Sequence, residues 1–199
     1  MTAGPEEVRD AYSRIADVYI GMFGTSAKVD ADDLAFIRRH LAGANGPVLD
    51  VGCGPGHITD HLRSLGVDAT GIDMVPEFLA YARETFPDGR YRLGVMDALD
   101  VADHSVAGIL AWYSMIHLPD PGAALAEFRR ALTPGGTLVI GFIDGDEVSA
   151  YDHKVVTAYR RPVSDLAERL TRAGFTEIEH VRRPAEGKHQ AYAAIAAHS

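Results

Sequence analysis

The chain has 199 residues, is 47% hydrophobic and carries a formal net charge of −9 at pH 7. This length and composition suit one domain with a single core, and no apolar run approaches the roughly 20 residues that cross a bilayer. The basic residues are scattered rather than gathered in a stripe, which argues against a nucleic-acid partner. The start, MTAGPEEVRD, lacks the basic and apolar regions of a signal peptide. Because Cys53 is the only cysteine, there is no internal disulfide, and we expect a cytoplasmic protein.

The amino-terminal part, residues 1–45, is expected to form a helical cap. Apolar residues at helical spacing predict one helix over about residues 5–20. These residues are Val8, Tyr12, Ile15 and Tyr19. The stretch GMFGTSAKVD then interrupts the chain, and Asp30 can cap a second helix that Gly43 ends.

The central part, residues 46–143, alternates apolar runs with amphipathic stretches. This alternation is typical of strand–helix–strand units in a parallel sheet. The expected strands are GPVLDV, VDATGID, RYRLGVMD, SVAGILAW and TLVIGFI. Helices are expected after the first strand's glycines, over PEFLAYARETF and over PGAALAEFRRAL, which the turn TPGG closes.

The remaining part, residues 144–199, is expected to hold an acceptor-side segment and a hairpin at the sheet edge. Residues 144–161 are polar and without a clear pattern, and a loop of that length is usually functional or disordered. A helix over PVSDLAERLTRAGF precedes strands over TEIEHVRR and QAYAAIAA. We therefore predict a single α/β domain over residues 1–199. Its Rossmann-like, doubly wound sheet has seven strands, mostly parallel with the last one antiparallel, and helices on both faces.

The stretch VLDVGCGPGHIT, residues 48–59, places three glycines at the end of the first strand. In a doubly wound sheet this turn lies where ligands bind, and glycines let a ligand approach the backbone. Such a turn alone would be a weak signal. However, Asp73 lies 17 residues after Gly56, near the spacing at which an acidic residue reaches a ribose, and Asp97 ends the third strand. The glycines and both carboxylates together favour a ligand at this edge of the sheet.

A nicotinamide-dependent enzyme is the obvious alternative. Its G-x-G-x-x-G/A pattern requires a small residue three positions after the second glycine, where this chain has His57. The imidazole would oppose the close helix–strand packing which that pattern provides. This weakens the alternative and leaves it open.

Several stretches together carry a family resemblance: VLDVGCGPG, GIDM, MDAL, LTPGGTLVI and AWYSMIHLPDPGAALAEFRRAL. From about residue 8 to its end, the chain resembles the class I S-adenosylmethionine (SAM)-dependent methyltransferases of the methyltransferase-11 type. Within them it is similar to short actinobacterial enzymes that carry AWYS-x-IH and TAYR-x-P stretches. One departure is Ala107, where the family commonly has an acidic residue before strand four.

The resemblance implies SAM as cofactor, S-adenosylhomocysteine as product and no metal. Asp73 would bind the ribose hydroxyls, and Asp50 would orient the glycine loop or meet the methionine amine. Met74 would pack on the adenine. The implied cofactor-binding residues are Asp50, Gly52, Cys53, Gly54, Gly56, Asp73, Met74, Met96, Asp97, Ala98, Tyr19 and Trp112.

The acceptor side is expected around the end of the fourth strand. His117 and Tyr113 are the candidate catalytic residues. The candidate substrate-binding residues are Tyr12, Tyr113, His117, His153, Tyr159 and Arg160. The alternative is that the rings before His117 only cover the core, that His117 makes a structural hydrogen bond to the backbone, and that the later residues belong to a solvated loop.

The resulting hypothesis is transfer of the SAM methyl group to a small-molecule acceptor by in-line displacement. The acceptor atom, O, N, C or S, stays open. The protein is expected to act as a monomer or homodimer, without a nucleic acid or a membrane. Two alternatives are a SAM cyclase or lyase and a catalytically silent partner subunit; the intact glycines and carboxylates argue against the second.

Overall fold

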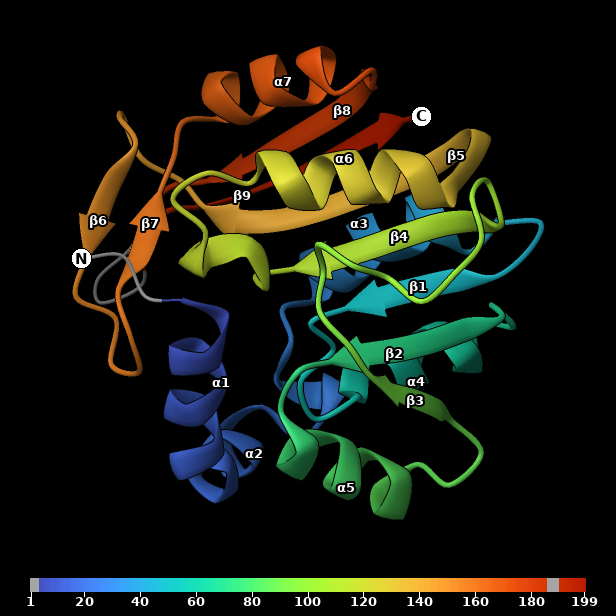
Figure 1. Ribbon diagram of the computed structural model, residues 1–199, viewed down its shortest axis with the longest axis vertical. Coiled ribbons are helices and arrows are strands. Elements are labelled where there is room, and N and C mark those ends of the chain that lie inside the picture. Colours follow the sequence, from blue (N-terminus) through green and yellow to red (C-terminus); the bar gives the residue numbers. More distant parts are fainter. Residues whose placement is uncertain (1–3, 186–189) are drawn as a thin grey trace.

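A seven-stranded sheet forms the centre of the molecule (Figure 1). The computed structural model describes residues 4–185 and 190–199. The strand order is β3-β2-β1-β4-β5-β9-β8. The strands are β1 (Val48–Val51), β2 (Ala69–Asp73), β3 (Arg90–Leu93), β4 (Val106–Trp112), β5 (Leu132–Ile143), β8 (Thr176–Arg183) and β9 (Tyr192–His198). Strands β1 to β5 all pair in parallel with one another, whereas β9 is antiparallel to its two neighbours, β5 and β8. This arrangement confirms the predicted fold class.

Helices cover both faces of this sheet (Figure 1). They are α3 (Ala31–Leu41), α4 (His57–Ser64), α5 (Pro76–Thr85), α6 (Gly122–Ala131) and α7 (Val163–Arg172). The central strand β4 is buried on both sides: Ile109 packs in the cluster that contains Phe128 of α6, and Leu110 in the cluster that contains Ile37 of α3. A strand covered on both faces reads as a continuous apolar run, which is why SVAGILAW was easy to recognise.

The amino-terminal segment differs from the single helix predicted over residues 5–20. It forms α1 (Pro5–Arg14) and α2 (Ala16–Phe23), separated at Ile15, whose φ of −116° and ψ of 14° are not helical. Helical spacing cannot reveal such a break, because the apolar positions keep their period across it. The bend brings the rings of Tyr12 and Tyr19 to a centroid distance of 5.4 Å. After the short helix η1 (Ser26–Lys28), Asp30 caps α3 as predicted.

Two further segments depart from the prediction. The polar stretch 144–161 contains a small antiparallel sheet, β6 (Ser149–Tyr151) with β7 (Ala158–Arg160). The TPGG sequence, expected as a turn, is already part of β5, which begins at Leu132 with an irregular register opposite β4. The positive φ of Gly135, 77°, accommodates this irregularity. Within the described ranges, no helix combines the length and the apolar character needed to cross a membrane.

Candidate functional site

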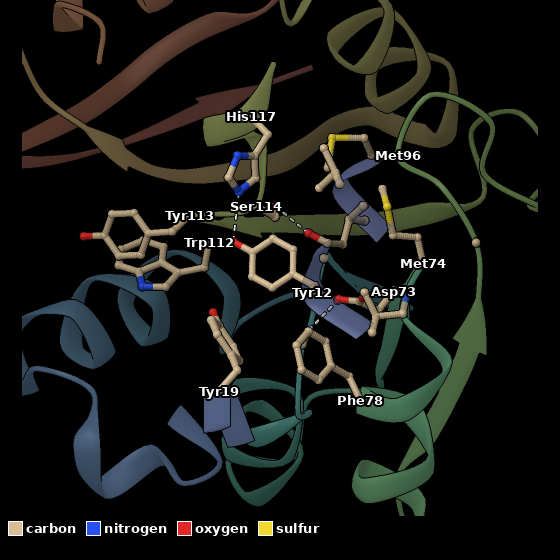
Figure 2. Close-up of a pocket in the computed structure, with 16 residues that line it drawn as sticks. Tyr12, Tyr19, Asp73, Met74, Phe78, Met96, Trp112, Tyr113, Ser114 and His117 are labelled. Atoms are coloured by element: carbon tan, nitrogen blue, oxygen red, sulfur yellow. Dashed lines mark hydrogen bonds between the residues drawn. The ribbon is translucent and has the colours of Figure 1, made fainter. Parts of the chain in front are cut away.

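Two adjoining cavities open at the carboxyl ends of β1, β2 and β4. The inner cavity has a volume of about 90 Å³ and is lined by residues that include Asp73, Met74, Phe78 and Met96 (Figure 2). The outer cavity has a volume of about 580 Å³ and extends towards β6 and β9. Six residues line both cavities: Tyr12, Tyr19, Gly52, Gly54, Trp112 and Tyr113. They mark the junction where two ligands could meet.

The glycine loop after β1 forms one wall of this junction. Gly52 has a φ of +77°, and a Cβ atom added to it would lie only 2.2 Å from the Cβ of Ser114. The Ser114 hydroxyl donates a hydrogen bond of 2.7 Å to the Val51 carbonyl, so the ends of β4 and β1 are held together. Gly54 also has a positive φ, +53°, but a Cβ there would meet only the Tyr19 ring, at 3.8 Å. The backbone at Gly54 therefore borders free space, as a ligand cradle requires.

We expect Gly52→Ala to lower the free energy of unfolding by about 2–4 kcal/mol, because it adds left-handed backbone strain to a steric clash with Ser114, which follows β4. Gly54→Ala is the matched variant: it shares the strain of about 1–2 kcal/mol but has no such clash. It should be closer to wild type in stability and still weaken binding of S-adenosylhomocysteine, since its methyl group enters the cavity. Urea denaturation and calorimetry measure the two effects. Wild-type stability of Gly52→Ala would contradict the steric argument.

Other predicted cofactor residues have different positions. A Cβ at Gly56 would lie 2.7 Å from the Tyr91 ring and 2.8 Å from Ala82, so this glycine serves the packing of α4 against its neighbours. The third strand ends at Leu93 instead of reaching Asp97. Asp97 and Ala98 lie in the following turn, exposed, and outside the lining of either cavity in the described structure.

Asp73 ends β2 and lies against the glycine loop. One carboxylate oxygen accepts a hydrogen bond from the Gly54 N–H at 2.7 Å, and the other accepts one from the Val75 N–H at 2.9 Å. Burial raises the pKa of Asp73 to about 6, although these backbone donors act in the opposite direction. Each carboxylate oxygen can accept a second hydrogen bond. The side chain is thus fixed and still able to bind a ribose hydroxyl.

Asp50 has a supporting position within β1. Its carboxylate is buried and accepts a hydrogen bond of 2.6 Å from the Thr59 hydroxyl, which joins β1 to α4 on either side of the glycine loop. Burial raises the pKa of Asp50 to about 7. Cys53 is buried, and burial also raises the pKa of its thiol, so it is not a ready nucleophile. His57 lines the outer cavity, and burial lowers its pKa to about 4.

These pKa values predict how ligand binding depends on pH. Protonation of Asp73 removes an acceptor for the ribose hydroxyls, so the affinity for S-adenosylhomocysteine should fall as pH falls through about 6. If S-adenosylhomocysteine binds only when Asp73 is ionised, its affinity should be about fourfold lower at pH 5.5 than at pH 7.5. Calorimetry at several pH values measures it. The Asp73→Asn variant should lose this step, whereas a step near pH 7 that survives would belong to Asp50.

His117 lies at the end of the inner cavity and connects two distant segments. Its Nε2 atom is 2.8 Å from the Tyr12 hydroxyl of α1 (Figure 2). Its Nδ1 atom is 2.9 Å from the Thr157 carbonyl. A carbonyl can only accept, so Nδ1 carries the proton and the Tyr12 hydroxyl donates to Nε2. Burial lowers the pKa of His117, which keeps the ring neutral. The structural hydrogen bond to the backbone is therefore present, and the unprotonated Nε2 accepts from the Tyr12 hydroxyl beside the cavity.

The end of β4 presents two aromatic rings to the cavities. Tyr113 has a φ of +52°, which is unusual for a bulky residue and is the kind of strain found at functional sites. Trp112 and Tyr113 each line the inner and the outer cavity, and their ring centroids are 5.2 Å apart. The left-handed backbone is what lets two consecutive side chains reach the same space.

The segment 144–161 contributes only part of what was predicted. The ring of His153 lies 5.4 Å from that of His117 and lines the outer cavity. Tyr159 and Arg160 are outside the described lining of both cavities, although the Arg160 guanidinium lies 4.4 Å over the ring of Tyr151. Several lining residues were missed from the sequence: Asp33, Tyr151, Arg183, Gln190 and Tyr192. Within residues 4–185 and 190–199 there is no group of three His, Cys, Asp or Glu residues placed to hold a metal.

Comparison with known proteins identifies the family. The family described as "Methyltransferase domain" matches residues 49–140. Malonyl-[acyl-carrier protein] O-methyltransferase of Yersinia pestis is 37% identical over 139 residues, which are 70% of this chain and 51% of that protein. Burkholderia thailandensis 1,6-didemethyltoxoflavin-N1-methyltransferase, solved with 1,6-didemethyltoxoflavin and S-adenosylhomocysteine, is 24% identical with a TM-score of 0.78, covering 100% of this chain and 91% of that one. The [4+2]-cyclase SpnF is 16% identical with a TM-score of 0.84, and the match covers 100% of this chain and 98% of that one.

These similarities differ in what they establish. The chain spans about half the length of curated relatives such as the Yersinia protein, of which it covers 51%. The two solved structures, both below 25% identity, establish the fold alone. The family match covers the stretch from β1 into β5 that carries the glycine loop and Asp73, and the curated relative agrees with it. Residues 49–140 therefore form a methyltransferase domain, and the chain is similar to the class I SAM-dependent methyltransferases.

Proposed function

We propose that the chain transfers the methyl group of SAM to a small-molecule acceptor. The observation that carries this proposal is the pair of adjoining cavities: the glycine loop lines both, and the inner cavity also holds Asp73 and the neutral His117. The relatives leave the acceptor atom open, because the names of two of them specify an O-methyltransferase and an N1-methyltransferase.

The inner cavity and the glycine loop fit SAM by their chemistry. Asp73 would accept hydrogen bonds from the ribose hydroxyls, and Met74, Phe78 and Met96 would surround the adenine with apolar groups. Gly54 would leave the backbone bare beside the methionine part. When bound, SAM supplies a methyl carbon that its sulfonium already activates. The protein then has to position the acceptor and exclude water.

His117 is proposed as the general base. Its Nε2 can take a proton from an acceptor that is still protonated at pH 7, and the Thr157 carbonyl would hold the charged ring through Nδ1. The Tyr12 hydroxyl occupies Nε2 in this structure, so the acceptor would replace it or donate to its oxygen. Tyr12 and Tyr19, from the cap formed by α1 and α2, would cover the bound ligands.

The test is product analysis by mass spectrometry after incubation of the purified chain with SAM and a panel of acceptors. Methyl transfer gives S-adenosylhomocysteine and an acceptor that is heavier by one methylene unit. The SAM cyclase or lyase alternative gives cleavage of SAM without any acceptor. A protein that binds S-adenosylhomocysteine in calorimetry and turns over nothing in the panel would support the silent-subunit alternative instead.

A further inference from the structure

The outer cavity has an aromatic wall assembled from three separate parts of the chain. Tyr113 follows β4, Tyr151 ends β6 and Tyr192 begins β9. All three rings pack around the buried Ile116 and Ile143 in one cluster. The rings of Tyr113 and Tyr192 lie 5.3 Å apart at an interplanar angle of 65°. Rings in this arrangement present edges and faces that attract another aromatic ring.

The described lining of this cavity holds three carboxylates, Asp30, Asp33 and Asp50, and two cationic side chains, Lys28 and Arg183. Arg183 pairs with Asp30 at 2.6 Å and also with Asp33. The Lys28 ammonium donates to the Gly21 carbonyl, and Asp50 accepts from Thr59. The guanidinium of Arg183 is therefore already paired, and carboxylates outnumber cationic side chains in the described lining. An anionic acceptor would have to break the Arg183 pairs or lie beside these carboxylates, and both are costly.

From these two observations we infer that the acceptor is an aromatic molecule without a negative charge that binds against Tyr113, Tyr151 and Tyr192. This rests on the proposed methyl transfer. The outer cavity, at about 580 Å³, is large enough for a bicyclic ring beside the methionine part of SAM. His153, whose ring lies 5.4 Å from that of the proposed base His117, also lines this cavity. A hydroxyl or ring nitrogen on the bound molecule would reach Nε2 through the junction, where Tyr12 lines both cavities and bonds to that atom.

A matched series of probes tests this inference by binding alone. The protein loaded with S-adenosylhomocysteine, and separately the unloaded protein, is titrated with 2-naphthol, decahydro-2-naphthol and 2-naphthoate at pH 7.5. The first is neutral and aromatic, the second has the same skeleton without aromaticity, and the third keeps the rings and adds a charge. We expect 2-naphthol to bind at least about tenfold more tightly than either of the others. Equal or tighter binding of either other probe would overturn the inference, as would the absence of 2-naphthol binding.

Variants at Tyr192 locate the binding. Tyr192→Phe keeps the ring and should retain 2-naphthol affinity, whereas Tyr192→Leu should lower it about tenfold and leave S-adenosylhomocysteine affinity unchanged. Ile178→Ala, at an exposed position of β8, is the control. Unchanged 2-naphthol affinity in Tyr192→Leu would refute this binding site. The two proposals fail separately, because 2-naphthol can bind a protein that transfers no methyl group, and product analysis can reveal transfer to an anionic or non-aromatic acceptor.

Discussion

Replacing Asp73 with alanine should weaken the binding of S-adenosylhomocysteine by a factor of about 10²–10⁴. The estimate follows from the loss of two charge-assisted hydrogen bonds to the ribose, each worth about 1.5–3 kcal/mol. The structure adds a second reason, since the same carboxylate accepts hydrogen bonds from Gly54 and Val75 and so fixes the glycine loop. Calorimetry with S-adenosylhomocysteine gives the affinity, and circular dichroism checks that the variant is folded.

The comparison variants separate these contributions. Asp88→Ala removes an exposed carboxylate in the turn after α5 and is the control for the change in net charge. Asp73→Asn keeps one oxygen acceptor and should fall between the wild type and the alanine variant. Asp97→Ala examines the adenine contact that the family resemblance implies. Wild-type affinity in a folded Asp73→Ala protein would rule out the ribose assignment.

The second large effect is expected at His117. His117→Ala should lower turnover with the acceptor found in the panel by about 10²–10⁴, the usual contribution of a general base. Its affinity for S-adenosylhomocysteine should stay within about threefold of wild type, because the imidazole is not among the groups proposed to contact the ribose, the adenine or the methionine part. Steady-state rates at saturating SAM, together with calorimetry, distinguish the two parameters. Equal losses of turnover and of cofactor affinity would show that the ring only holds the fold.

Tyr12→Phe refines this prediction. It retains the ring that packs on Tyr19 and Phe78 and removes only the hydroxyl that donates to His117. If that hydroxyl merely occupies Nε2 until the acceptor arrives, turnover should change less than about tenfold, which is below the contribution of a general base. A loss as large as that of His117→Ala would mean that the proton passes through the Tyr12 oxygen.

Much of the sheet was predictable because its signals are local. The buried strands are continuous apolar runs, and the glycine loop and Asp73 are recognised from spacing alone. The boundaries were less reliable. The break at Ile15 preserves helical spacing, and the start of β5 at Leu132 depends on pairing with β4 rather than on the TPGG sequence itself.

The acceptor side was less predictable because its contacts join distant parts of the chain. Tyr12 and His117 are 105 residues apart, and no local pattern announces their hydrogen bond. Tyr192 reaches the outer cavity only because β9 pairs with β5, which places it opposite Ile143 at the carboxyl end of that strand. Tyr151 lies on a short, half-exposed strand that lacks the alternation by which strands are recognised.

The position of β9 has a consequence for the growing chain on the ribosome. This strand of seven residues fills the gap between β5 and β8, yet it is synthesised after both. Until residues 192–198 have emerged, the apolar strand β5 has one unpaired edge, and such an edge is prone to pair with other chains. The carboxyl-terminal part of the sheet therefore cannot assemble in the order in which it is translated. During synthesis, the edge of β5 therefore stays open to pairing with other chains until β9 has been made and pairs with it.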